Sequence, residues 1–236
     1  AYVDLESVPD IVGDEPCLIV QSTGVPMVVG SNRQRSIEYL LSKHQLDLII
    51  SDDGLQHLAL ERQIEWIVLD QNRGLGNQKL LPEGYLREPP SRLNTGTVIE
   101  HAAEPDSALN MHLEVATPYL LNAVEGTPFN PADNFYAVVG IGFPQRFYKT
   151  LDSMGIHQFQ GHEFPDHYDY EITDLQFEDG NPIITTEKDA VKLLPLLKQN
   201  PDFKREIWVV PVEAVLSPGC YEVLHQQLQQ LGIQIS

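Results

Sequence analysis

Short apolar runs that alternate with helix-like segments set the fold class of this chain. Residues 26–30, 46–51 and 64–70 are apolar runs of strand length, and the last two lead into acidic residues. Between the first two, residues 33–44 carry apolar side chains at a helical spacing. Strands separated by helices are typical of a parallel, doubly wound sheet. We therefore expect an α/β fold whose functional loops gather at the carboxyl ends of the strands.

A second series of strand and helix signals occupies the C-terminal half. Its members are residues 135–140, 144–154, 182–186, 188–198, 207–212 and 219–231. Between the two series, residues 97–101 and 111–123 read as extended connector strands. The sequence therefore predicts a core domain over residues 1–125 and a smaller α/β domain over residues 126–236, a division that suits a chain of 236 residues.

Charge and composition exclude several classes of protein. The formal net charge of −19 opposes binding to nucleic acid or to anionic lipid surfaces. No run of about 18 apolar residues is present, and the N-terminus lacks the features of a signal peptide. The first residue is not Met, which indicates a fragment or a processed chain. Cys17 and Cys220 lack metal-ligand spacing and are predicted to be reduced thiols.

The strongest local motif is the segment LIISDDGLQH at residues 48–57. An apolar strand that leads into Asp52 and Asp53 resembles a Walker B arrangement, in which a carboxylate at a strand tip holds Mg²⁺. Gln56 and His57 follow on the turn, within reach of a phosphate or a nucleophile. The alternative is a plain Asp-Asp-Gly turn with a helix cap, because acidic residues are common after strands.

Two further clusters contain candidate acid–base groups. Asp14 and Glu15 could supply a general base or a metal-site carboxylate, although a helix start capped by Asp14 explains the same residues. The segment HEFPDHYDY at residues 162–170 could form an Asp–His proton relay or a metal site that uses His162, Asp166 and His167. A solvated loop with packed aromatic side chains is the alternative for that segment.

Phosphate-binding groups are scarce. Five of the eight arginines are candidates for bidentate phosphate binding, although each alone is more often a surface ion-pair partner. They are Arg33, Arg35, Arg73, Arg87 and Arg92. A P-loop requires glycine directly before its lysine. None of the seven lysines follows a glycine, so the sequence contains no Walker A loop.

Six segments together resemble the tetraacyldisaccharide 4′-kinases, the lipid A 4′-kinases. They are VGDEPCLIVQSTGVPMVVGSNR (12–33), DLIISDDGLQHLAL (47–60), RGLGNQKLLPEGYLREPPSRL (73–93), VVGIGFPQRFYKTL (138–151), FPDHYDY (164–170) and ITTEKDAVKL (184–193). They follow the order of the family and span nearly the whole chain. The SDDGLQH and LLP-x-G-x-LREP segments are specific to that family.

The resemblance implies a P-loop-kinase-like α/β/α core, incomplete at its N-terminus, and a second, smaller α/β domain. It implies transfer of the γ-phosphate of ATP, with Mg²⁺, to the 4′-hydroxyl of a lipid A disaccharide precursor. By residue match it assigns a general base and its partner to Asp14 and His167. It assigns the Walker B pair to Asp52 and Asp53. It assigns further active-site positions to Arg33, Gln56, His57 and Glu88.

The resemblance also sets limits. The family's Walker A loop and its membrane-associated N-terminal helix lie upstream of the first matched segment, so this chain is expected to be inactive alone and to reach the membrane only through that segment. Gln63 stands where the family usually has an acid and is expected to be structural. The implied location is the cytoplasmic face of the bacterial inner membrane. A non-catalytic remnant and a metal-dependent hydrolase built on Asp52, Asp53, His57 and residues 162–167 are the alternatives.

Overall fold

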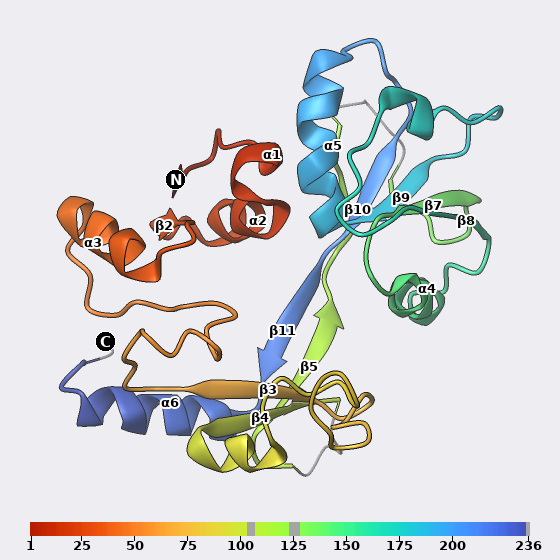
Figure 1. Cartoon of the computed structure of the whole chain (residues 1–236). Coiled ribbons are helices and arrows are strands. Elements are labelled where there is room, and N and C mark those ends of the chain that lie inside the picture. Colours follow the sequence, from red (N-terminus) through yellow and green to blue (C-terminus); the bar gives the residue numbers. More distant parts are fainter. Residues whose placement is uncertain (103–106, 123–127, 235–236) are drawn as a thin grey trace. The chain divides into compact units, whose positions relative to one another are not determined.

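A five-stranded sheet forms the centre of one of two structural units in this chain. The computed structural model describes residues 1–102, 107–122 and 128–234 (Figure 1). The first unit combines residues 1–45 with 115–212, and the second combines residues 46–114 with 213–236. Each unit thus joins two stretches that are distant in the sequence. The predicted domain boundary between residues 125 and 126 lies outside the described residues.

The first unit contains most of the regular structure. Its strands are β1 (Tyr2–Val3), β2 (Met27–Val28), β6 (Tyr119–Leu120), β7 (Phe135–Val139), β8 (Phe159–Glu163), β9 (Ile183–Thr186) and β10 (Ile207–Val210). Its helices are α1 (Pro9–Val12), α2 (Asp14–Thr23), α3 (Arg33–Lys43), α4 (Pro144–Ser153) and α5 (Glu187–Gln199), with the 3-10 helix η2 (Ile172–Leu175). The sheet order is β6-β10-β9-β7-β8, in which only the β6–β10 pair is antiparallel.

Helices cover both faces of this sheet, as the alternation of side chains along β7 shows. Phe135, Ala137 and Val139 share one core cluster with Phe147 and Leu151 of α4. Val138, which points to the opposite face, lies in a second cluster with Leu193 of α5. Because successive strand residues face opposite sides, α4 and α5 flank the sheet (Figure 1). A parallel sheet covered on both faces explains why its strands read as continuous apolar runs.

The N-terminal helices attach to this sheet through α5. Val191 on α5 belongs to a third core cluster with Val3, Val12, Cys17 and Val20. This packing places the start of α2 close to the start of α5. A residue at the N-terminus of α2 is therefore held near the carboxyl end of β9, where α5 begins.

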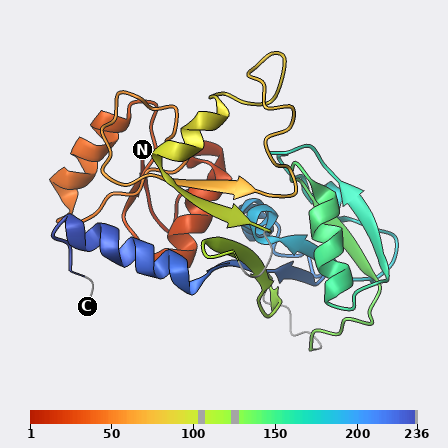
Figure 2. The same ribbon diagram turned by 90° about the horizontal axis from the view of Figure 1, so that it is seen from below.

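The second unit is built on a four-stranded sheet of order β11-β5-β4-β3. Its elements are β3 (Trp66–Asp70), the 3-10 helix η1 (Pro90–Thr95), β4 (Thr97–His101), β5 (Asn110–Val115), β11 (Val212–Leu216) and α6 (Pro218–Gln230). Helix α6 runs beside this sheet (Figures 1 and 2). Gln227 on α6 accepts a hydrogen bond from the Trp66 indole at 2.8 Å and donates one to the Thr97 hydroxyl at 2.8 Å.

One predicted strand is absent, and this corrects the sequence interpretation. Residues 46–51 form no strand, and no described strand pairs with them. Ile50 in this segment is 86% exposed and Leu48 is 44% exposed. A strand is stable only when a neighbour completes its hydrogen bonds and covers its apolar face. The apolar pattern is present, but the described residues do not supply that neighbour.

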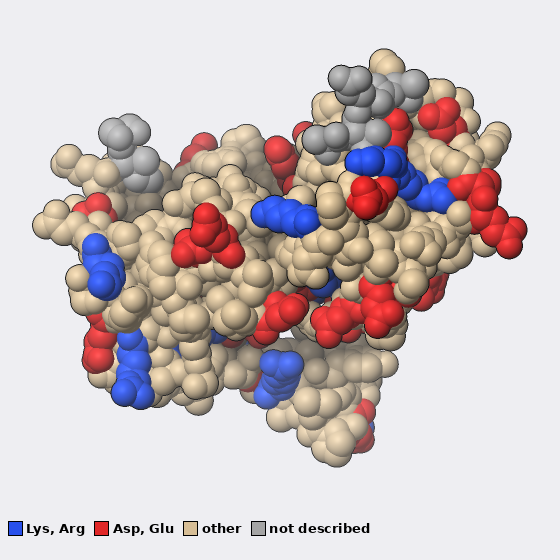
Figure 3. Space-filling model, turned by 90° about the horizontal axis from the view of Figure 1, so that it is seen from above, with Lys and Arg blue, Asp and Glu red and all other residues tan. Residues whose placement is uncertain are grey.

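The other predicted strands and helices are present, with ends shifted by a few residues, and the α/β class with parallel sheets is confirmed. The stretches predicted as connectors form β4, β5 and β6, which are members of the four-stranded and five-stranded sheets, whereas β1 and β2 form a separate antiparallel pair. Cys17 and Cys220 are buried free thiols. No helix among the described residues is long and apolar enough to cross a membrane. On the face drawn in Figure 3, basic side chains are interspersed with acidic ones.

Candidate functional site

Asp14 occupies the first position of α2 in the first unit. Gly13, with a φ of 95°, is the N-cap residue, and its left-handed backbone requires glycine. The Asp14 side chain makes no capping hydrogen bond, although the predicted helix start at this point is correct. Asp14 is 6% exposed, and its Oδ2 has no hydrogen-bond partner among the described residues. A buried carboxylate oxygen that is left without a donor is available to accept a proton.

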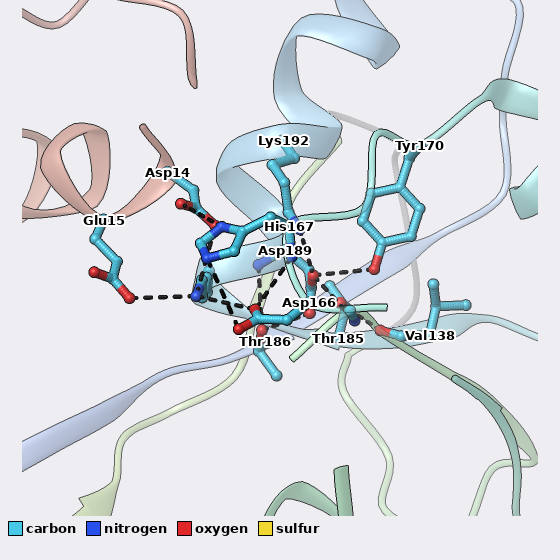
Figure 4. Close-up of polar contacts among 12 residues, drawn as sticks. Asp14, Glu15, Val138, Asp166, His167, Tyr170, Thr185, Thr186, Asp189 and Lys192 are labelled. Atoms are coloured by element: carbon cyan, nitrogen blue, oxygen red, sulfur yellow. Dashed lines mark hydrogen bonds and ion pairs between the residues drawn. The ribbon is translucent and has the colours of Figure 1, made fainter. Parts of the chain in front are cut away.

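His167 faces this carboxylate from the loop that follows β8. Its Nδ1 lies 3.4 Å from Oδ1 of Asp14, so the predicted Asp14–His167 pair is present (Figure 4). His167 has a φ of 60°, an uncommon backbone conformation for a residue with a side chain. The Asp166 carboxylate accepts a hydrogen bond from the His167 backbone N–H at 3.1 Å. The His167 side chain is 65% exposed, so a bound substrate can reach the imidazole, whereas the Asp14 side chain is only 7% exposed.

Lys188 is a third member of this site that sequence reasoning missed. It lies in the first turn of α5, and its Nζ is 3.8 Å from Oδ2 of Asp14. The same Nζ donates hydrogen bonds to Glu15 and Asp166, each at 3.2 Å. The segment ITTEKDAVKL contained the signal, because a lysine one residue after the helix start projects beyond the carboxyl end of a parallel strand.

A buried carboxylate, Asp189, joins the backbone elements beneath this cluster. Asp189 has no exposed surface, and it accepts hydrogen bonds from the Gly140 N–H at 3.2 Å and from the Tyr170 hydroxyl at 3.0 Å. It also accepts a hydrogen bond from Thr186 at 2.8 Å, and Lys192 Nζ lies 3.2 Å away (Figure 4). Asp189 therefore connects the end of β7, the loop that carries His167, and the start of α5.

Electrostatics within the cluster follows from these contacts. Partial burial opposes the charged form of Lys188, but its hydrogen bonds and charge interactions with Asp166, Asp14 and Glu15 outweigh this effect and raise its pKa. Partial burial likewise opposes the charged form of Asp166, but the Lys188 ammonium prevails and lowers its pKa. Burial raises the pKa of the Tyr170 phenol, and the adjacent Asp189 adds to this shift. Lys188 is therefore a stable cation among carboxylates at neutral pH.

The second unit holds the SDDGLQH turn. Asp52, Asp53, Gln56 and His57 all lie on the surface, so neither acidic residue of the Walker-B-like pair is packed into an interior. Asp53 has a φ of 46°, and its backbone N–H donates to the Asp52 carboxylate at 2.9 Å. The short loop that this hydrogen bond forms presents both carboxylates to solvent.

Two arginines brace this turn. Arg62 donates hydrogen bonds to the carbonyl oxygens of Gly54 at 2.5 Å and Leu55 at 3.0 Å. Glu65 contacts both Arg62 and Arg92, each at 2.6 Å. The hydrogen bond from Arg92 lowers the pKa of Glu65 despite partial burial. Arg92, a candidate phosphate ligand in the sequence, is thus an ion-pair partner in this structure.

A pocket of about 370 Å³ lies against the turn within the second unit. It is lined by Asp53, Leu55, Gln56, Ile67, Leu75, Tyr85, Leu86, Arg87, Glu88, Pro89, Pro90, Arg92 and Leu93. Glu88 accepts hydrogen bonds from Gln56 at 2.7 Å and Arg92 at 2.8 Å. Three predicted site residues, Asp53, Gln56 and Glu88, therefore share one concave surface with Arg87. His57 is not among the residues that line it.

The remaining predictions have separate outcomes. Arg33 is the first residue of α3 in the first unit, whereas Asp52, Asp53, Gln56, His57 and Glu88 belong to the second. The alternative metal site does not form, because no group of three or more potential ligands occurs among the described residues. His162 lies on β8 and contacts the rings of Tyr136 and Phe177, with centroids 5.5 and 4.6 Å away. His162 therefore packs against aromatic rings and does not take part in a metal site among the described residues.

Mg²⁺ fits the paired acids on the turn. This ion typically binds to one or two carboxylates and completes its shell with water and substrate phosphates. Asp52 and Asp53 are adjacent, exposed carboxylates of that kind. A group of three protein ligands is not required for such binding.

Comparisons with known proteins identify the family of this chain. Residues 1–229 match the family described as Tetraacyldisaccharide-1-P 4'-kinase. A Tetraacyldisaccharide 4'-kinase from Psychrobacter arcticus is 44% identical over 278 residues, which cover 100% of this chain and 72% of that protein. This chain belongs to the tetraacyldisaccharide 4′-kinase family. Another member, from Psychrobacter cryohalolentis, is 45% identical over 271 residues, with the same coverage of both proteins.

A solved structure extends the family comparison to the fold. A crystal structure of LpxK from Aquifex aeolicus in complex with ATP matches with a TM-score of 0.73 and 25% sequence identity. The match covers 98% of this chain and 74% of that one. This likeness supports the α/β fold with parallel sheets described above.

Proposed function

We propose that this protein transfers the γ-phosphate of ATP to the 4′-hydroxyl of a tetraacyldisaccharide 1-phosphate, a step of lipid A biosynthesis. Family membership supports the reaction class, and the related LpxK from Aquifex aeolicus was crystallised with ATP. The observation that carries the proposal is the buried Asp14 carboxylate, which contacts His167 through one oxygen and has no hydrogen-bond donor on the other. A phosphotransferase that acts on an alcohol needs such a base beside the acceptor hydroxyl.

The proposed reaction uses the two oxygens of Asp14 differently. Oδ2 accepts the proton of the 4′-hydroxyl while the hydroxyl oxygen forms a bond to the γ-phosphorus. The bond between the γ-phosphorus and the β,γ-bridging oxygen breaks, ADP leaves, and the proton remains on the enzyme until it passes to solvent. His167, 3.4 Å from Oδ1, orients the carboxylate and is the group that can receive the proton from it. This exposed imidazole gives the proton a path to water.

The family resemblance supports the proposed metal and phosphate contacts. Asp52 and Asp53 would hold Mg²⁺, which neutralises phosphate charge when it is bound. Gln56, His57, Glu88 and Arg33 remain predicted contacts to substrate or phosphate. Since no lysine in this sequence follows a glycine, we propose that a segment outside this sequence supplies the glycine-rich phosphate loop. We propose the same origin for contact with the cytoplasmic face of the inner membrane, since a chain of net charge −19 is poorly suited to bind anionic lipid.

The test uses the full-length gene product, Mg-ATP and a tetraacyldisaccharide 1-phosphate in detergent micelles. Asp14→Asn keeps the shape of the side chain but removes the base, so kcat should fall by about 10²–10⁴-fold while nucleotide affinity changes little. Asp10→Asn, an exposed aspartate on α1, is the matched control and should keep full activity. Equal losses of turnover and nucleotide affinity would show that Asp14 is structural. Absence of transfer by the wild type would favour a non-catalytic remnant.

A further inference from the structure

Among the described residues, Lys188 is the basic residue that forms ion pairs with Asp14, Glu15 and Asp166. Its Nζ lies 3.2 Å from Glu15 Oε1, 3.2 Å from Asp166 Oδ1 and 3.8 Å from Asp14 Oδ2. The side chain is 21% exposed, so solvent screens these interactions only in part. One ammonium group thus connects α2, α5 and the loop that carries His167.

The fold determines this position. Thr186 caps α5 by accepting a hydrogen bond from the Asp189 N–H at 3.2 Å, which places Lys188 in the first helical turn. Packing of Val191 against Cys17 and Val20 then holds α2 beside α5. Because both helices begin at this edge, the first turn of each contributes to one cluster. The contact is not apparent from the sequence, since Asp14 and Lys188 are far apart along the chain.

The Lys188 ammonium group interacts differently with its three carboxylate partners. Toward Glu15 and Asp166 it is within hydrogen-bond range, whereas 3.8 Å to Asp14 Oδ2 exceeds that range. The ammonium group therefore lies beside the Asp14 carboxylate without forming a hydrogen bond to Oδ2, the oxygen proposed to accept a proton. Asp166 Oδ1, which accepts from Lys188, also accepts from the His167 backbone N–H. The same contact therefore holds His167 in its left-handed conformation.

We propose that Lys188 is a positioning residue that places a positive charge beside the Asp14 carboxylate and holds the His167 loop against it. This inference deepens the proposed kinase function and rests on it. The charged or titratable groups that face Asp14 are His167 from the loop, Lys188 from α5, and Glu15 and Cys17 on its own helix, and Asp166 reaches it through Lys188. Removal of Lys188 leaves the two carboxylates beside His167, those of Asp14 and Asp166, without that fixed cation.

The expected effect is a change in pH dependence. An opposite charge within about 4–6 Å shifts a pKa by about 1–3 units. In Lys188→Met, the acidic limb of the plot of kcat/KM against pH should move to higher pH, because a catalytic carboxylate that loses a neighbouring cation is protonated more easily. Loss of the contact that holds the His167 loop should also lower kcat at pH 7 by about tenfold, whereas KM for ATP and for the disaccharide should change less than about twofold. Lys188→Arg keeps the positive charge, so it should retain most of the wild-type activity and the acidic limb of the wild-type pH profile.

Two controls separate positioning from other roles. Lys198→Met removes an exposed lysine from the last turn of the same helix and should leave the pH profile unchanged. Lys188→Gln provides a second, polar replacement in case Lys188→Met does not fold, and the same upward shift is expected. If either folded variant raises KM but keeps the wild-type pH profile, Lys188 binds substrate directly and the proposal is overturned.

A measurement without substrate tests the proposal independently of the kinase activity. The His167 pKa is followed by NMR in protein with ¹³C-labelled histidine, and its signal is assigned by comparison with His167→Gln. Loss of Lys188 should raise this pKa by about half a unit or more, because Asp14 and Asp166 then act on the imidazolium without an opposing cation. An unchanged His167 pKa would overturn the inference even in an active kinase. A wild type that transfers no phosphate but shows the shift would refute the kinase function alone.

Discussion

Asp189 offers a quantitative test of what holds the first unit together. This carboxylate is fully buried and has four polar partners, namely Gly140, Tyr170, Thr186 and Lys192. Asp189→Ala leaves a buried ammonium group and three buried or half-buried donors without their acceptor. Removal of one partner of a buried ion pair costs about 3–5 kcal/mol, and we expect about 4 kcal/mol here. That is a large share of the roughly 5–15 kcal/mol that stabilises a typical domain.

A double-mutant cycle isolates the ionic part of this effect. Asp189→Asn keeps the size of the side chain and one acceptor oxygen but removes the charge, so we expect a loss of about 2 kcal/mol. Lys192 has a side chain that is 9% exposed, and Lys192→Met keeps its apolar stem. In the double variant Asp189→Ala with Lys192→Met, the unpaired charge is gone, so the total loss should be smaller than the sum of the single losses by about 2 kcal/mol.

The assay is urea unfolding at pH 7 followed by tryptophan fluorescence. The chain has two tryptophans, Trp66 in the second unit and Trp208 in the core of the first. A Trp66→Phe background therefore makes the signal report on the first unit. If Asp189→Ala loses less than about 1 kcal/mol of unfolding free energy with an unchanged m-value, Asp189 does not anchor the end of β7, the His167 loop and the start of α5 to one another.

Further predictions concern both units. Leu151→Ala removes a fully buried side chain from the α4 side of the sheet and should cost about 2–5 kcal/mol of unfolding free energy in the same urea assay. Arg92→Met removes the partner that lowers the pKa of Glu65. At pH 7 the variant should lose about 1–2 kcal/mol of unfolding free energy, because the ion pair is only partly buried. This loss should become smaller as the pH falls below the ordinary pKa of Glu65. Thermal unfolding of the wild type and of Arg92→Met between pH 7 and pH 3 tests this pH dependence, and a stability difference that stays constant with pH would contradict it. Thr185→Val removes a buried hydroxyl that donates to the Val138 carbonyl at 2.7 Å and should cost about 1–2 kcal/mol by urea unfolding, whereas Thr173→Val on the surface should cost little.

The local sequence pattern was sufficient to predict most of the strands and helices, but it did not predict which strands pair with one another. The run at residues 135–140 appears as β7, and the helical spacing at residues 188–198 appears as α5. The equally clear apolar run at residues 46–51 forms no strand, because pairing depends on a neighbour that local pattern does not encode. Strand β8 was missed, since PheGlnGlyHisGlu has neither a continuous apolar run nor strict alternation.

The candidate site likewise contains some residues that the sequence identified and others whose contacts only the structure shows. Family resemblance named Asp14 and His167, and the structure places them 3.4 Å apart. Lys188 was overlooked because a lysine in a helical first turn looks like ordinary surface charge. Arg92 looked like a phosphate ligand, yet it pairs with Glu65 and Glu88. The identity of a charged residue indicates what it can bind, but its partner depends on which elements pack together.

The sequence by itself determined the α/β class, the family and the chemical groups available for phosphoryl transfer. These depend on short-range features, namely hydrophobic periodicity and contiguous motifs, which are readable in one dimension. Only the tertiary structure decided that the first turns of α2 and α5 share one cluster, and that a single ammonium group serves three carboxylates from distant segments. Burial and charge pairing arise when residues far apart in the chain are packed together, and no local pattern records that event.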